Sequence, residues 1–399
     1  MKNKSLNPNQ SLNLPDYFNK YIKGLFFVGI IFSIISLVYY FVNKHNFFYS
    51  YLTSFSFFLT LSLGGMFIVL IHHITRTGWS VVIRRVPEGF MKNIGLMAVL
   101  SLPIFFGLHE LYHWAHEGAA LHDHLLAVKA PYLNVAFFVL RIIIYFLLWN
   151  WIASHFFNKS VSQDQTGDEA NTFDLQRRST YSLIIFAFTV SFASIDYIMS
   201  LTPHWYSTIF GVYIFAGAVL VAYCFTSLVF MFLRSKNLLN EIVNLEHFHD
   251  LGKLIYGFNI FWSYIAFSQF FLIWYANIPE EVLFFADHFA GSWNIIAIIL
   301  SVGHFGIPFI FFMSRHVKRN LAIHCFFAIW LIIMHFLDLY WIIMPNLYKE
   351  GFVITLFDVA PFIAIGSIFF AFFFKRLKKH SLIPIKDPRL SEALNFENF

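Results

Sequence analysis

The amino-acid sequence predicts an all-α integral membrane protein. Of its 399 residues, 58% are hydrophobic and only 12% are charged, whereas soluble domains carry about 25% charged residues. Apolar stretches long enough to cross a bilayer, which takes about 20 residues, recur along the whole chain. These two observations exclude a soluble enzyme or a soluble binding domain.

Ten apolar segments predict ten transmembrane helices. They cover residues 21–42, 50–72, 92–114, 133–156, 180–201, 205–234, 251–275, 293–314, 320–344 and 353–376. Between the second and the third, segment 74–91 mixes arginine with tryptophan, valine and isoleucine, which predicts a helix lying on the inner membrane surface. Segment 158–178 is polar and is expected to form a mobile inner loop, and residues 380–399 are expected to form a polar tail.

The distribution of basic residues predicts the orientation. Of the 27 lysines and arginines, 23 fall in the two tails and in every second loop. The opposite loops hold only Lys44, Lys129 and Lys349, and Arg141 lies inside the fourth span. Because cytoplasmic loops are enriched in basic residues, both termini are expected to be cytoplasmic. The net charge of +5 therefore reflects topology, and no nucleic-acid binding is expected.

Two acidic residues indicate an internal repeat. Asp196 lies near the end of the fifth span and Asp338 near the end of the ninth, 142 positions later, each seven residues before a proline. This predicts two four-helix bundles, formed by spans 2–5 and spans 6–9, with one flanking helix at each end of the chain. The corresponding divisions are the tail and first helix (1–45), the first bundle (46–203), the second bundle (204–346) and the last helix with its tail (347–399).

Both repeated acids are candidates for proton transfer. Charge inside a bilayer is costly, so ionisable groups there usually face a bundle interior and usually have a function. His335 lies one turn before Asp338, and a carboxylate beside an imidazole stabilises its protonated form. The alternative is a buried polar pair that only holds helices together. Arg141 needs a counter-ion, and Glu110 or Asp196 lies at a compatible depth, so a structural ion pair is expected.

Three further polar residues extend this candidate relay inward. They are His304, Tyr264 and Gln269, each within or near a predicted span of the second bundle. Single polar residues in large helical bundles also commonly do no more than bond a neighbouring helix.

The third span ends in HELYHWAHE (109–117), which contains an HExxH pattern. On a continuous helix His109 and His113 would share a face with Glu110 beside them, as in zinc metalloproteases. Three hypotheses stay open: an intramembrane zinc protease, polar residues at a helix end, and groups that exchange protons near the outer surface. Haem held by His109 and His335 is a further alternative. Cys224 and Cys325 stand alone, so neither an iron–sulfur cluster nor covalent haem is expected.

Several segments resemble the NrfD-like membrane subunits of the PsrC/NrfD superfamily. They are PHWYSTIFGVYIFAG (203–217), HDLGKL (249–254), FWSYIAFSQFFLIWYANIPEE (261–281) and GSW (291–293). The chain is most similar to the ActF-type subunit of bacterial alternative complex III, over roughly residues 45–345. The 261–281 segment is the most specific part of this resemblance.

The resemblance implies two four-helix bundles in a multi-pass subunit of the bacterial cytoplasmic membrane. It implies a respiratory quinol:cytochrome c (electron-acceptor) oxidoreductase, in which this chain carries no redox metal. The implied partners are a sister NrfD-like quinol subunit, outer-face iron–sulfur and multihaem cytochrome subunits, lipids and, as a further option, a terminal oxidase. The resemblance allows a quinone, either menaquinone or ubiquinone, as a molecule bound by this chain. The implied proton-transfer or quinol-proximal residues are Glu110, His113, Asp196, His335 and Asp338. The alternatives are the zinc protease and a purely structural scaffold.

Overall fold

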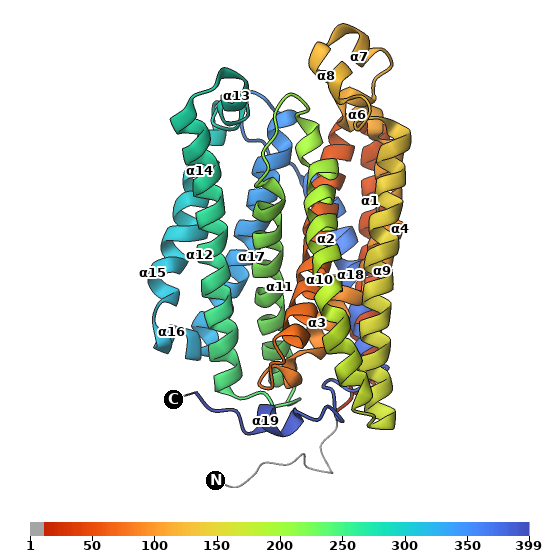
Figure 1. The fold of residues 1–399 in the computed structure, drawn as a ribbon, viewed down its shortest axis with the longest axis vertical. Coiled ribbons are helices and arrows are strands. Elements are labelled where there is room, and N and C mark those ends of the chain that lie inside the picture. Colours follow the sequence, from red (N-terminus) through yellow and green to blue (C-terminus); the bar gives the residue numbers. More distant parts are fainter. Residues whose placement is uncertain (1–11, 399) are drawn as a thin grey trace.

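The computed structural model describes residues 12–398, and these residues form helices joined by short connections. Figure 1 shows the long helices running side by side, with α7, α8 and α13 at one end and α19 at the other. Nine helical segments of the described part are long and apolar enough to cross a membrane. The prediction of an all-α membrane protein is therefore confirmed at this level.

Eight helices are long and continuous. They are α1 (Phe18–Val42), α2 (Lys44–Ile74), α9 (Val135–Thr166), α10 (Ala170–Tyr197), α11 (Phe210–Ser235), α12 (Leu245–Ala276), α17 (Leu321–Ile343) and α18 (Leu356–Leu377). Two further crossings are interrupted. One consists of α3 (Arg85–Lys92), α4 (Ile94–Leu100) and α5 (Leu102–Phe106), and the other of α14 (Trp293–Ile299), the π-helical η4 (Leu300–Gly306) and α15 (Ile307–Phe312).

Short helices cap the two ends of the molecule. They are η1 (Val81–Ile83), α6 (Leu108–Leu111), η2 (His113–Ala115), α7 (Ala119–His122), α8 (His124–Lys129), η3 (Met199–Leu201), α13 (Pro279–His288), α16 (Arg315–Arg319), η5 (Met344–Asn346) and α19 (Leu390–Leu394).

The predicted seventh span, 251–275, forms the greater part of α12. This helix is 32 residues long, but it is not among the nine apolar segments. Polar side chains such as Asn259, Ser263 and Gln269 interrupt its apolar sequence. The count of ten spans therefore stays a prediction, and the polar residues of α12 lie where the candidate site forms.

The expected inner-surface helix over 74–91 is wrong. The third crossing begins at Arg85, earlier than the predicted boundary of 92. Arg85 and Glu88 are fully buried and joined by an ion pair of 2.9 Å, and Arg85 also bonds Asp164 of α9. Because each charge has a partner inside the protein, this basic segment is stable in the interior and does not need the membrane surface.

The expected mobile loop over 158–178 is also wrong. Helix α9 continues to Thr166 and α10 begins at Ala170. Side-chain hydrogen bonds join the two helices here, from Gln163 to Thr172 at 2.7 Å and from Lys159 to Asn171 at 3.2 Å. The polar composition therefore belongs to a helical hairpin that extends beyond the apolar part of both spans.

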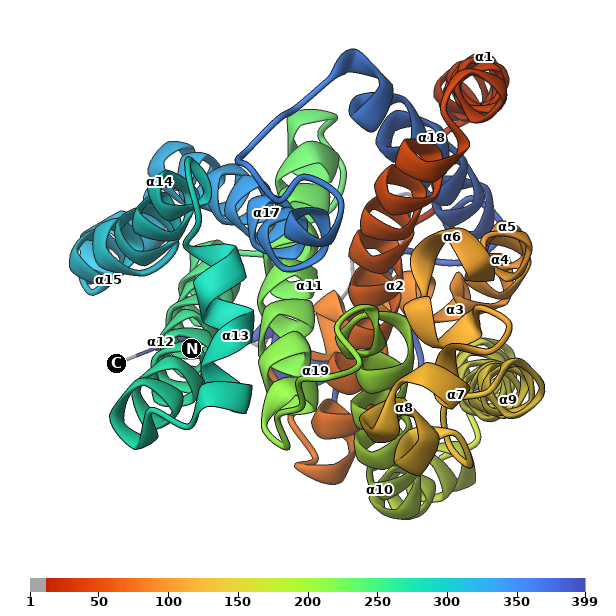
Figure 2. The same ribbon diagram turned by 90° about the horizontal axis from the view of Figure 1, so that it is seen from above.

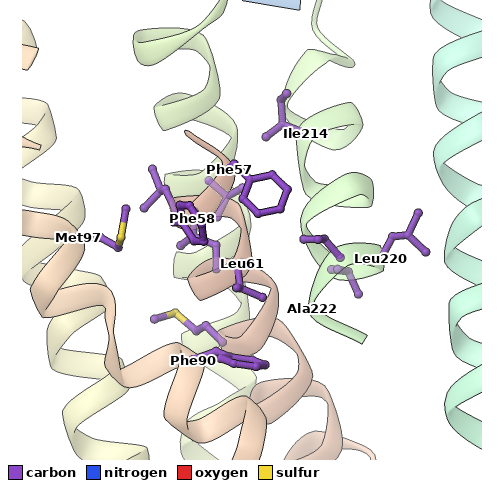
Figure 3. Close-up of a cluster of buried hydrophobic side chains, with 14 of the residues drawn as sticks. Phe57, Phe58, Leu61, Phe90, Met97, Ile214, Leu220 and Ala222 are labelled. Atoms are coloured by element: carbon purple, nitrogen blue, oxygen red, sulfur yellow. The ribbon is translucent and has the colours of Figure 1, made fainter. Parts of the chain in front are cut away.

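Helices α2 and α11 form the centre of the molecule (Figure 2). Helix α2 also packs against α3, α10 and α18, α11 packs against α12 and α17, and α1 packs mainly against α18. A side chain at Gly64 would place its Cβ 2.0 Å from the carbonyl oxygen of Ala218, so the glycine allows α2 and α11 to approach closely. Figure 3 shows the apolar core around this contact, including Phe57, Phe58 and Leu61 of α2 and Leu220 of α11.

The C-terminal tail lies across the α19 end of the molecule. Arg84 pairs with Asp387 at 2.9 Å, and the Ile385 amide donates to Asp164 at 2.9 Å. The Leu382 amide donates to the carbonyl of Leu12 at 2.7 Å. Both described ends of the chain therefore lie at the α19 end of the molecule. The prediction that both termini are cytoplasmic stays a prediction.

Candidate functional site

Asp196 is held in a closed ion-pair network at the end of α10. Arg141 of α9 donates to both carboxylate oxygens, at 2.8 and 3.0 Å, and the Tyr145 hydroxyl donates at 2.8 Å. The Arg141 guanidinium also lies 3.8 Å from the ring centroid of Tyr132. Asp196 is 0% exposed. The structure thus pairs Arg141 with Asp196 rather than with Glu110, and the contacts hold both charges in place.

Asp338 has a different environment, although it occupies the matching place in the second half. The Tyr213 hydroxyl of α11 donates to one carboxylate oxygen, and the Trp262 indole of α12 donates to the other at 3.1 Å. Asp338 is only 2% exposed, and no ion pair joins it to a basic side chain of residues 12–398. A buried carboxylate without a counter-ion is a better proton acceptor than one in an ion pair.

His335 does not bond Asp338, contrary to the expected pair. Its Nε2 lies 3.1 Å from the Thr60 hydroxyl of α2, and its Nδ1 has no protein partner. The ring occupies space left by Gly217, where a Cβ would lie 2.6 Å from the imidazole. Residues on one helix face can therefore bond different neighbours, because His335 bonds α2 while Asp338 bonds α11 and α12.

His304 lies in the π-helical turn, next to the partner of Asp338. Its ring stacks on Trp262 with centroids 3.7 Å apart, and neither ring nitrogen has a protein partner. Asn259, one turn before Trp262 on α12, is 1% exposed and also has no protein partner for its amide atoms. π-helical turns often occur at functional sites, and buried polar atoms of this kind are usually satisfied by water. A polar seam therefore extends from Asp338 toward the inner side.

A cavity of about 440 Å³, which we call the Asp338 pocket, adjoins this carboxylate. It lies among α12, α13, η4 and α17, and Asp338 is the only carboxylate among its lining residues. Gln269 and Tyr264 line it as well, and the Gln269 carbonyl oxygen has no protein partner. Tyr264 and Phe267 of α12 are 62% and 63% exposed. The pocket thus opens on the side of the molecule, and the remaining lining is mainly aromatic and aliphatic.

A second cavity of about 540 Å³, the outer cleft, lies nearer the α13 end. Its ionisable lining residues are His45, His109, Glu110, His113, His116, His204, Glu280, Asp287, His288 and Lys349. Glu110 bonds Lys44 at 3.1 Å and His45 at 3.4 Å. Partial burial opposes ionisation of Glu110, but Lys44 and His45 lower the pKa of this carboxyl below its usual value. The cleft is thus a polar surface, separate from the Asp338 pocket.

The expectation that His109 and His113 share a helix face is wrong. Helix α6 ends at Leu111, Tyr112 is extended, and His113 begins the separate turn η2. Among residues 12–398, no group of three histidine, cysteine, aspartate or glutamate side chains is arranged to hold a metal ion. His109 lies in the outer cleft, whereas His335 is buried against α2 at the centre of the molecule, so the proposed haem pair is not brought together.

The isolated chain should show no haem absorption and no stoichiometric zinc. The reason is that the HExxH histidines lie on different helical turns and the candidate haem histidines lie in different regions. Visible spectroscopy and elemental analysis of the purified chain test this directly. Zinc at one equivalent, lost together with function in His113→Ala but kept in the control His122→Ala, would instead support the protease hypothesis.

Sequence reasoning missed three residues of the site. Tyr213 and Trp262 are ordinary aromatic residues of apolar spans, and only the packing shows that they bond Asp338. His288 is buried beside the outer cleft, and its sequence position does not distinguish it from the other histidines among the 18 in the chain. No signal in the sequence distinguishes them, because each acts through a neighbour that is far away along the chain.

Comparison with known proteins does not identify the function of this chain. No protein-family model matches the chain, and a search of curated proteins found no significant match. The functional conclusion therefore depends on the chemistry of the Asp338 pocket and on the residue patterns given above.

Proposed function

We propose that this chain is a ten-span membrane subunit of a bacterial quinol-oxidising respiratory complex. We place a quinol site of this chain in the Asp338 pocket. The observation that carries the proposal is a cavity of about 440 Å³ that opens on the side of the molecule and contains a single carboxylate without a counter-ion. This volume lies within the usual range of about 300–1,000 Å³ for small-molecule sites. An aromatic-lined pocket that opens sideways suits a ring-shaped headgroup whose isoprenoid tail stays in the lipid.

Asp338 supplies the proton acceptor in this proposal. Oxidation of a quinol to a quinone releases two protons and two electrons. The Asp338 carboxylate takes the first phenolic proton, and it takes the second after the first has been passed on. Tyr213 and Trp262 hold the two carboxylate oxygens in place for this step. The polar seam with His304, His335 and Asn259 lies on the inner side of the same carboxylate. The electrons pass to iron–sulfur or haem centres of partner subunits on the outer face.

The first bundle has a supporting role. The closed network of Asp196, Arg141 and Tyr145 joins α9 to α10 and stabilises their packing. This favours the scaffold hypothesis for the first half of the chain. The sister quinol subunit, the iron–sulfur and cytochrome subunits and, where present, a terminal oxidase would bind around this scaffold. The zinc-protease hypothesis has no comparable support, because its histidines are separated by the break after Leu111.

A photoreactive quinone should label α12 and α17 in the complex isolated through a tag on this chain. Ser301→Trp, at the lipid-facing rim of the pocket, should reduce this labelling at least fivefold by filling the entrance. Peptide mass spectrometry after irradiation measures the effect. Labelling of α12 that is absent, or unchanged in Ser301→Trp, would contradict the proposed site.

Ser33→Trp is the matched control for this experiment. Ser33 of α1 is exposed on the lipid-facing surface and bonds the carbonyl of Gly29 at 2.7 Å. Ser301 likewise is exposed and bonds the carbonyl of Ala297 at 2.9 Å. The two substitutions therefore place the same bulky ring at equivalent lipid-facing serines, and only the one at the pocket should reduce labelling.

A further inference from the structure

One aromatic partition separates the Asp338 pocket from the outer cleft. The Phe284 side chain lines both cavities. Its ring stacks on His288 with centroids 3.8 Å apart and on Trp205 with centroids 4.0 Å apart. His288 lines the outer cleft and is 1% exposed. It is therefore a buried titratable group at the boundary between the two cavities.

Both ring nitrogens of His288 face backbone carbonyl oxygens. Nδ1 lies 2.6 Å from the oxygen of Phe284, and Nε2 lies 3.2 Å from the oxygen of Ile342. A carbonyl oxygen only accepts hydrogen bonds, so a neutral imidazole satisfies one of these contacts and a protonated imidazole satisfies both. Burial acts in the opposite direction and lowers the pKa of His288. These opposing effects suit a group that gains and loses a proton.

The position of His288 connects it to Asp338 through α17. Ile342 lies one helical turn beyond Asp338, and both residues line the Asp338 pocket. The Trp341 indole donates to the backbone carbonyl of His288 at 3.0 Å, which fixes α13 against α17. On the other side, the outer cleft presents Asp287, adjacent in the chain, together with Glu280, His204 and Lys349.

We propose that His288 passes the protons released at Asp338 to the outer cleft. The proposal rests on the proposed quinol site. In this step the neutral imidazole takes up a proton at the ring nitrogen that carries none, so that Nδ1 and Nε2 both donate to the carbonyls of Phe284 and Ile342, and it then loses one proton to an acid of the outer cleft. No electrons move in this step, and His288 returns to its neutral form after each transfer. His288 is thus a proton-relay residue that does not touch the quinol.

His288→Gln should lower quinol turnover of the assembled complex at least tenfold without changing KM for quinol. Glutamine keeps a hydrogen-bond donor for one carbonyl but does not titrate. Proton release on the outer side, followed with a membrane-impermeant pH dye, should slow by the same factor. His124→Gln is the matched control, because His124 of α8 is exposed at the same end of the molecule and lines neither cavity. It should keep the parental rate of turnover and of proton release.

The outcomes separate this inference from the proposed function. Parental turnover and proton release in His288→Gln, with Asp338→Asn inactive, would overturn the relay and leave the quinol site intact. Activity in Asp338→Asn as well would overturn both. Should His288→Gln fail to assemble, infrared difference spectra of the parental complex with ring-¹⁵N histidine test the same step. A histidine band that shifts during turnover is expected, and spectra in which no histidine band shifts would overturn the relay.

Discussion

Asp338→Asn should lower quinol oxidation by about 100-fold or more, the loss typical of removing a general base, while the complex still assembles. Asparagine keeps the size of the side chain, and its carbonyl oxygen can still accept a bond from Tyr213 or Trp262. It has no carboxylate to take the phenolic proton. Turnover of the complex with a soluble quinol, measured beside its yield and subunit composition, tests this expectation.

Asp358→Asn is the matched control for this variant. Asp358 is also a buried carboxylate, 2% exposed, and it is bonded by Ser50 and by Thr355 at the start of α18. It does not line the Asp338 pocket, so its replacement should leave turnover close to the parental rate. If both variants oxidise quinol at the parental rate with unchanged proton release, Asp338 has only a structural role.

Asp196→Asn should destabilise the chain strongly instead of changing its chemistry selectively. Removing one partner of a buried ion pair leaves the other charge uncompensated, which typically costs about 3–5 kcal/mol. The Arg141 guanidinium would then lie buried among Tyr132 and Tyr145 without a counter-ion. Thermal unfolding of the purified chain in detergent should show a large decrease in the midpoint, together with a low yield of assembled complex.

The double variant Arg141→Gln with Asp196→Asn distinguishes this ion pair from a proton path. Removing both charges together should recover much of the stability lost in the single variant, so the two substitutions should be non-additive. Asp174→Asn, which removes a partly exposed pair with Arg178, should lower the midpoint far less. Parental stability in Asp196→Asn combined with lost proton release would contradict the structural role and favour proton transfer at Asp196.

Sequence and structure differ most clearly for the two repeated acids. Their equal spacing from Pro203 and Pro345 makes both of them candidates for proton transfer, yet Asp196 is paired with Arg141 and Asp338 is not. Helix α9 supplies a cation to Asp196, whereas α12 supplies an indole to Asp338. A sequence repeat describes where a residue lies along its own helix. The side chain that bonds this residue comes from another helix, and the repeat does not specify it.

The sequence by itself determined the class of the protein and most of its spans. Apolar composition and segment length depend on local residues and on the thickness of the bilayer, so nine predicted segments are confirmed by helices of the described part. Only the tertiary structure decided the site. The break after Leu111, the turn of His335 toward Thr60, the pocket at Asp338 and the place of His288 between two cavities each depend on contacts between helices distant along the chain. Such contacts depend on how side chains of neighbouring helices fill the space between them, which no local pattern specifies.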